Sequence, residues 1–129
     1  MTRVVIVDDQ PAFRRHLRRL LAHAGMDVVG EAEEILEAEG MVVALQPDLA
    51  VVDLVLPGIN GIEGIARLKA LQPGLRAILV SVHRDQAHLL QAAAITAGAE
   101  AFVPKDALDL SVVKAWGEAP ARDGAPSST

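Results

Sequence analysis

Short apolar runs alternate along this chain with longer segments of helical periodicity, five times in 129 residues. An uninterrupted apolar run is typical of a parallel strand that is covered on both faces. Regular alternation of such strands with helices predicts an α/β fold, a doubly wound parallel sheet with right-handed crossovers. The predicted strands lie at residues 4–7, 26–30, 49–52, 77–80 and 101–103, of which 26–30 is the weakest and is expected at an edge.

The helical segments carry their own start and stop signals. The first begins at Pro11, a favourable first-turn residue, and ends before Gly25. Its apolar residues recur at i, i+4, i+7, i+8 and i+11, so they share one face. These residues are Phe13, Leu17, Leu20, Leu21 and Ala24. Further helices are predicted over about 34–45 and 61–71, from a cap at Asp85 to about Gly98, and from Asp106 or Asp109 to about Trp116.

Composition limits the class of protein. Residues 1–116 are predicted to form one domain, and residues 117–129, rich in Gly, Pro, Ala and Ser, a disordered tail or linker stub. The absence of Cys excludes disulfides, a thiolate zinc site and a Cys nucleophile. A net charge of −5 and 2% aromatic residues argue against direct nucleic-acid binding. With neither a membrane-spanning run nor a signal peptide, we expect a cytoplasmic protein without membrane contact.

Polar residues follow four of the five predicted strands. Asp8 and Asp9 come directly after the first strand and Asp53 after the third. Ser81 ends the fourth strand, and Lys105 lies just past the fifth. Ligands of doubly wound sheets bind outside the carboxyl ends of the strands. We therefore expect three carboxylates, one hydroxyl and one ammonium to meet at one edge of the sheet.

These groups favour one kind of chemistry. Clustered carboxylates repel one another unless a cation joins them or a proton is taken up, and ligands that are all oxygen favour Mg²⁺. A carboxylate can also act as a nucleophile toward phosphorus. A lysine and a metal ion would then neutralise the transferring phosphoryl group. The set predicts phosphoryl transfer onto an aspartate with Mg²⁺ as cofactor.

Four segments resemble the signature segments of response-regulator receiver domains from two-component signalling. They are VVIVDDQP, VVDLVLPGING, ILVSV and GAEAFVPK, and they occur in the family's order over about residues 3–116. The chain is most similar to nitrate/nitrogen-fixation-type receivers, which usually precede a helix-turn-helix DNA-binding domain. The resemblance implies a flavodoxin-like (βα)5 sheet with strand order 2-1-3-4-5.

The resemblance also implies roles for the polar residues. Asp53 matches the phosphoacceptor, which receives phosphoryl from a phosphohistidine of a sensor histidine kinase or phosphotransfer protein. Asp8, Asp9 and Asp53, with the backbone carbonyl of Val55, match the Mg²⁺ ligands. Lys105 matches the lysine that contacts the phosphoryl group. The family catalyses only its own phosphorylation and dephosphorylation, so we expect no further enzyme activity.

Other positions match parts of the family's switch. Ser81 and Phe102 match the two residues that form the family's switch. His83 and Val55 match the positions that tune how fast the phosphoryl group is lost. Pro57, Gly58 and Gly61 match the turn after the acceptor, where glycine permits unusual backbone angles. The apolar stretch 89–95 exceeds what one buried stripe requires, and it lies in the family's usual output surface. That surface, on the fourth helix, fifth strand and fifth helix, could join two copies of the chain.

Two departures from the family pattern leave questions open. Many relatives have a cis proline bond directly after the lysine, whereas here Pro104 precedes Lys105 and Asp106 follows it. The isomer of that bond is not predicted. The sequence also contains no DNA-binding domain, so it fits either a fragment of a transcription regulator or a stand-alone receiver.

Two functions from other classes stay as alternatives. An aspartate-nucleophile phosphohydrolase of the D-x-D type needs a general acid two residues after the nucleophile, where this chain has Val55. A binding module that kept the fold would act without phosphorylation. A dinucleotide site is disfavoured, because Gly58, Gly61 and Gly64 are not spaced as G-x-G-x-x-G and follow the wrong strand. The arginines at 14, 15, 18 and 19 are interpreted as a solvated face, or as one that steers an acidic kinase surface.

Overall fold

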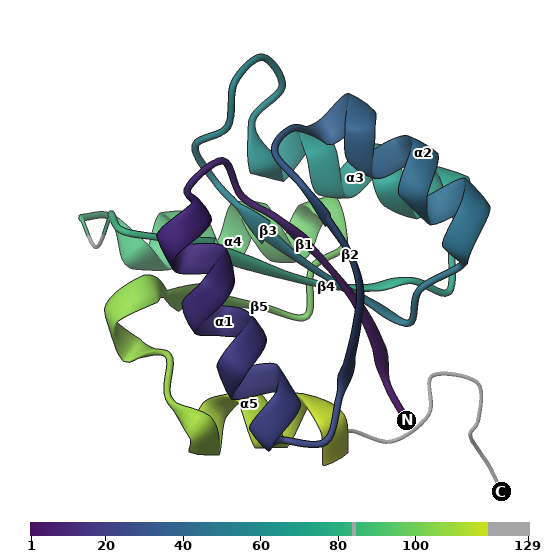
Figure 1. The fold of residues 1–129 in the computed structure, drawn as a ribbon. Helices are drawn as coiled ribbons and strands as arrows, with labels where there is room; N and C mark the ends of the chain where they lie inside the picture. The colour runs from purple at the N-terminus through teal and green to yellow at the C-terminus, as the bar shows by residue number, and fades with distance from the viewer. Residues whose placement is uncertain (84, 119–129) are drawn as a thin grey trace, which may run out of the picture.

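A computed structural model describes residues 1–83 and 85–118, which form a five-stranded sheet flanked by helices (Figure 1). The strands are β1 Arg3–Val7, β2 Asp27–Ala32, β3 Leu49–Asp53, β4 Arg76–Ser81 and β5 Ala101–Pro104. The helices are α1 Pro11–His23, α2 Ile35–Leu45, α3 Gly61–Leu71, α4 Ala87–Ala97 and α5 Leu110–Glu118, with a 3₁₀ turn, η1, at Lys105–Ala107. All strand pairs are parallel, in the order β2-β1-β3-β4-β5. The predicted fold class and strand order are confirmed.

The helices divide into two layers. Helices α1 and α5 cover one face of the sheet, and α2, α3 and α4 cover the other (Figure 1). Within β1, Val5 and Val7 pack on the α2–α4 side, while Val4 and Ile6 pack on the α1–α5 side, all fully buried. This is why the central strands are apolar without interruption over residues 4–7, 49–52 and 77–80. Burying each valine, leucine or isoleucine there stabilises the fold by about 1.5–3 kcal/mol. The edge strand β2 begins with the exposed Asp27, as its weaker pattern predicted.

Two helix starts depend on backbone detail. Helix α4 begins at Ala87, and its cap residue is Gln86, with a left-handed φ of 60°. Asp85 is therefore one residue too early, and its prediction as the cap is wrong. Of the two residues predicted to start α5, Asp109 is the one that caps the helix, because its Oδ1 accepts a hydrogen bond from the Val112 N–H at 2.9 Å. Asp106 lies instead in η1.

The C-terminal part of the domain is attached to the sheet by a buried arginine. Arg76 donates from Nη2 to the Trp116 carbonyl at 2.9 Å and pairs with Glu100 through Nε. Gly117 and Glu118 still belong to α5, and the rest of the predicted tail, residues 119–129, lies outside the described residues. No peptide bond in the described ranges is cis, so the bond between Lys105 and Asp106 is trans. Within the same ranges, none of the helices reaches the length and apolar character that a membrane span requires.

Candidate functional site

The carboxyl ends of β1 and β3 bring three carboxylates together. The two strands are neighbours, and Val7 is the register partner of Val52, so Asp8 and Asp53 emerge side by side. Ligand oxygens of Asp8, Asp9 and Asp53 all lie within 4.8 Å of one another. Asp8 and Asp53 are buried, while Asp9 is exposed. The predicted acidic group is therefore assembled at the predicted edge of the sheet.

Lys105 reaches the same group from a distant strand. Two strands, β3 and β4, separate β5 from β1 in the sheet, and Lys105 extends toward the acidic group from η1, the turn that follows β5. Its Nζ lies 2.7 Å from Asp8 Oδ2 and 3.6 Å from Asp53 Oδ1. The side chain is only 8% exposed. One ammonium thus faces three carboxylates, which leaves negative charge uncompensated when all three are ionised.

The excess of negative charge contributes to a raised pKa of Asp53. Burial raises the pKa of the Asp53 carboxyl from its ordinary 3.8 to about 6, and the nearby charges of Asp8 and Asp9 add to the increase. Lys105 and a hydrogen bond from the Val55 backbone lower the pKa, without reversing the shift. A cation at this position would relieve the repulsion.

The residues present fit a hard metal ion. Asp8 Oδ2 is fully buried and has no hydrogen-bond partner in the part of the chain that the structure describes, although the Lys105 ammonium lies beside it as an ion pair. A buried carboxylate oxygen with spare acceptor capacity is suited to ligation. The donors are all oxygens, which favours Mg²⁺ or Ca²⁺ over softer metals. Asp8, Asp9 and Asp53 could therefore hold a divalent cation.

Asp8 is held by neighbours to which the sequence analysis gave no role in the site. Its Oδ1 accepts a hydrogen bond from the Gln10 backbone N–H at 2.8 Å, and its carbonyl accepts one from Arg14 Nη1 at 2.6 Å. Arg14 in turn pairs with Glu31 on β2 at 3.0 Å. Arg14 was grouped with the solvated arginines because helical periodicity places it opposite the apolar face. Only the packing of α1 against β2 shows that it anchors the end of β1.

The remaining predicted residues lie around this centre rather than in it. Ser81 is fully buried directly after Val80, the register partner of Asp53, and its Oγ accepts a hydrogen bond from the His83 N–H at 3.0 Å. The Phe102 ring is buried in the core on the α2–α4 side. The residues Val55 and His83 are exposed.

The loop after Asp53 depends on two glycines for different reasons. Gly58 has a φ of +77°, as expected for a turn glycine. Gly61 is not in the left-handed region, so the prediction that it supplies an unusual backbone angle is wrong. A Cβ atom at Gly61 would lie 2.2 Å from the Asp53 carbonyl oxygen, because α3 begins directly against the end of β3. Gly61 is needed for close approach, and it packs α3 against the backbone of Asp53.

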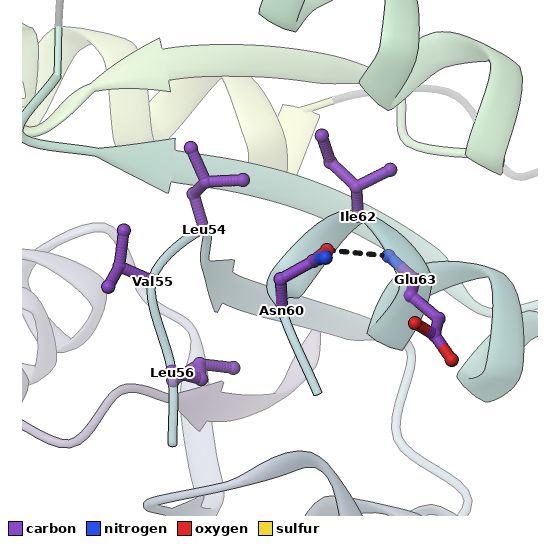
Figure 2. Close-up of a pocket in the computed structure, with 6 residues that line it drawn as sticks. All are labelled: Leu54, Val55, Leu56, Asn60, Ile62 and Glu63. Carbon is purple, nitrogen blue, oxygen red and sulfur yellow. Dashed lines mark hydrogen bonds between the residues drawn. The ribbon is translucent and has the colours of Figure 1, made fainter. Parts of the chain in front are cut away.

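The same loop borders an open, mainly apolar hollow of about 430 Å³. Figure 2 shows Leu54, Val55 and Ile62 around it, with Asn60 at the start of α3. Asn60 Oδ1 accepts a hydrogen bond from the Glu63 N–H at 3.0 Å and so caps the helix.

The sequence profile of the response regulator receiver domain family matches residues 4–115. This match spans most of the chain, and it includes both acidic strand ends and the lysine. The chain belongs to this family. The predicted receiver resemblance is therefore confirmed.

Known receivers resemble the chain in sequence and in structure. It is 40% identical to the DNA-binding transcriptional activator DevR/DosR of Mycobacterium tuberculosis over 89% of this chain and 52% of the relative. It is 35% identical to the chemotaxis protein CheY of Thermotoga maritima over 88% of this chain and 92% of that protein. The receiver spans about half the length of the first curated relatives it matches.

Two solved structures place the fold among receivers. The signal receiver domain of the response regulator NarL from Mycobacterium tuberculosis has a TM-score of 0.81 and 34% identity, covering 91% of this chain and 94% of that one. A response regulator from Burkholderia pseudomallei, solved with a phosphorylated aspartic acid and a calcium ion, has a TM-score of 0.77 and 26% identity, covering 89% and 65%. The similarity to NarL agrees with the predicted nitrate-type receiver.

The raised pKa of Asp53 predicts how the stability of the metal-free receiver depends on pH. The folded state binds the proton more tightly than the unfolded chain does, so this contribution is fully present below pH 3.8 and is lost as the pH rises to about 6. We expect the unfolding free energy of wild type, relative to an Asp53→Asn variant, to fall by about 2 to 3 kcal/mol between pH 4 and pH 8. Urea unfolding in EDTA measures this difference. Parallel pH profiles for the two proteins would contradict it.

Proposed function

We propose that this receiver accepts a phosphoryl group on Asp53 from a phosphohistidine of a sensor histidine kinase or a phosphotransfer protein, with Mg²⁺ as cofactor. One observation carries the proposal: a buried carboxylate, its pKa raised to about 6, lies beside two more carboxylates and one buried ammonium. The negative charges of such a cluster repel one another, so an added cation would favour the ionised form of the Asp53 carboxylate. The phosphorylated aspartic acid of the Burkholderia pseudomallei relative supports the same chemistry.

In the proposed reaction an Asp53 carboxylate oxygen attacks phosphorus. The P–O bond forms as the P–N bond to the donor histidine breaks, and the electron pair of that bond goes to the histidine nitrogen. Lys105, 3.6 Å from Asp53 Oδ1, would offset charge on the phosphoryl oxygens. Asp8, Asp9, Asp53 and the Val55 carbonyl would hold Mg²⁺, which when bound neutralises further phosphoryl charge.

Incubation with acetyl phosphate tests the acceptor chemistry without knowledge of the kinase. We expect Mg²⁺-dependent addition of one phosphoryl group, prevented by EDTA and removed by hydroxylamine, which cleaves acyl phosphates. Borohydride reduction should convert residue 53 to homoserine, and peptide mass spectrometry can locate it. A label that resists hydroxylamine, or one that forms equally in EDTA, would contradict the proposal.

We propose that the chain is a switch without steady enzyme turnover. Val55 occupies the position where a D-x-D phosphohydrolase has its general acid, and a valine side chain cannot donate a proton. Phosphate esters should therefore not be hydrolysed continuously. A module that binds without phosphorylation would leave acetyl phosphate unreacted. The same incubation therefore separates such a module from a receiver that accepts a phosphoryl group.

The readout surface is proposed from the exposed apolar residues of the last elements. Leu89 and Ile95 on α4 are 55% and 47% exposed, and Leu110 on α5 is 39% exposed. Ser81 and Phe102 would link the acceptor to this surface, where a second copy of the chain or an output domain could bind. The DNA-binding relative supports a role in transcription when such a domain follows.

Val55 is proposed to influence how long the phosphoryl group persists. Val55 is 56% exposed and lies two residues after the acceptor, so its side chain is accessible to water near Asp53. Val55→Asn is expected to speed phosphoryl loss severalfold, because an amide can hydrogen-bond water near the acyl phosphate. The decay is followed on phosphate-affinity gels, and Val43→Asn, at a 60% exposed site on α2, is the matched control. Equal decay in both variants would remove Val55 from this role; His83, also exposed, can be tested in the same way.

A further inference from the structure

The Lys105 ammonium has an aromatic neighbour as well as oxygen neighbours. Its Nζ is 2.7 Å from Asp8 Oδ2, 3.6 Å from Asp53 Oδ1 and 3.5 Å from the Gln10 side-chain oxygen. The same Nζ lies over the ring of Phe13, 4.1 Å from the ring centroid. Three oxygens and one aromatic face thus surround the cation.

Phe13 lies in the first turn of α1, close behind the acidic loop. It was expected to be a core residue because it starts the apolar face of this helix. The structure leaves it only partly buried, at the margin of the core on the α1–α5 side, with its ring beneath the ammonium. The negative face of an aromatic ring attracts a cation, and more strongly when water is excluded. Lys105 meets that condition, because its side chain is 8% exposed.

We infer that Phe13 is a positioning residue for Lys105, holding the ammonium beside Asp8 and Asp53 so that it is in place when a phosphoryl group reaches the acceptor. The inference rests on the proposed function. The ring has no net charge and no ligand atom, so a metal ion at the carboxylates would not compete for it. The carboxylates, in contrast, would be shared between metal and lysine. The attraction between Phe13 and Lys105 therefore does not depend on the carboxylates and persists when the site is loaded.

Graded fluorination of residue 13 separates electrostatic positioning from shape. Fluorine atoms withdraw electron density from the ring and weaken its attraction for a cation while changing its size little. We expect the initial rate of phosphorylation by acetyl phosphate with Mg²⁺ to fall stepwise through mono-, di- and trifluorophenylalanine. Phe13→Leu should reduce the rate by about tenfold, the size of effect expected for a buried cation–π contact. Phe13→Tyr should restore most of the rate.

Two controls keep the test specific. Leu20→Val perturbs another partly buried residue of α1 in the same core cluster, and should lower thermal stability without changing the rate. In a Lys105→Met background, where no cation remains, fluorination of Phe13 should have no effect.

The possible failures are distinguishable. A wild-type protein that takes up no phosphoryl group refutes the proposed function, and with it any role of Phe13 in that reaction. If the wild-type protein is labelled, and fluorination of residue 13 leaves the labelling rate unchanged, the inference about Phe13 alone is overturned. Fluorine effects that persist after Lys105→Met would also overturn it, because they could not act through the ammonium.

Discussion

An Asp53→Asn protein is expected to take up no phosphoryl group from acetyl phosphate or from a cognate kinase. Its side chain has nearly the same shape as aspartate, but an amide oxygen is a far weaker nucleophile than a carboxylate. The other two carboxylates do not replace it, because Asp8 is paired with Lys105 at 2.7 Å and Asp9 is exposed. Intact-protein mass spectrometry after incubation measures the loss, which should be complete.

The control for this substitution is an aspartate at the other end of the sheet. Asp27 is exposed at the start of β2, so Asp27→Asn makes the same chemical change away from the site. It should be labelled as wild type is. The Asp53→Asn protein should remain folded and, without metal, be more stable than wild type near neutral pH, since it lacks a buried charge. Equal labelling of the two variants would refute Asp53 as the acceptor.

Gly61→Ala is expected to damage both the fold and the acceptor. The new Cβ would lie 2.2 Å from the Asp53 carbonyl oxygen and 2.9 Å from a methyl group of Leu79. Backbone cannot move aside as a flexible side chain can, so α3 must separate from β3 or Asp53 must shift. We expect a loss of about 3 kcal/mol in unfolding free energy, as in severe overpacking. Phosphoryl uptake should fall sharply, because the displaced carboxylate leaves Lys105 and its acidic neighbours.

A second glycine provides the matched comparison. Gly40 lies inside α2, exposed, and a Cβ there would meet nothing within 4 Å. Gly40→Ala should stabilise the protein by about 0.5–1 kcal/mol, because alanine loses less conformational entropy in a helix. Urea unfolding and acetyl phosphate labelling of both variants test the contrast. A Gly61→Ala protein with wild-type stability and labelling would show that the contact between α3 and β3 is not tight.

Some elements of this receiver could be read from local pattern. The apolar runs 4–7, 49–52 and 77–80 lie in the central strands β1, β3 and β4, because both faces of these strands are covered and the covered positions need apolar residues. The start of α4 could not be read in this way. Asp85 is a good capping residue type, but the chain enters the helix through a left-handed Gln86, and that backbone choice has no clear signal in a glutamine.

The sequence by itself determined the alternation of strands and helices, and with it the placement of Asp8, Asp9, Asp53 and Lys105 at one edge of a parallel sheet. This followed because side chains that end parallel strands emerge at the same edge, whatever the packing between layers. Only the tertiary structure decided which groups touch Lys105 and why Gly61 must be glycine. Those contacts join residues far apart along the chain, at distances set by how α1 and α3 pack on the sheet. Helical periodicity predicts the face of the helix on which a residue lies, but not the atoms that its side chain contacts.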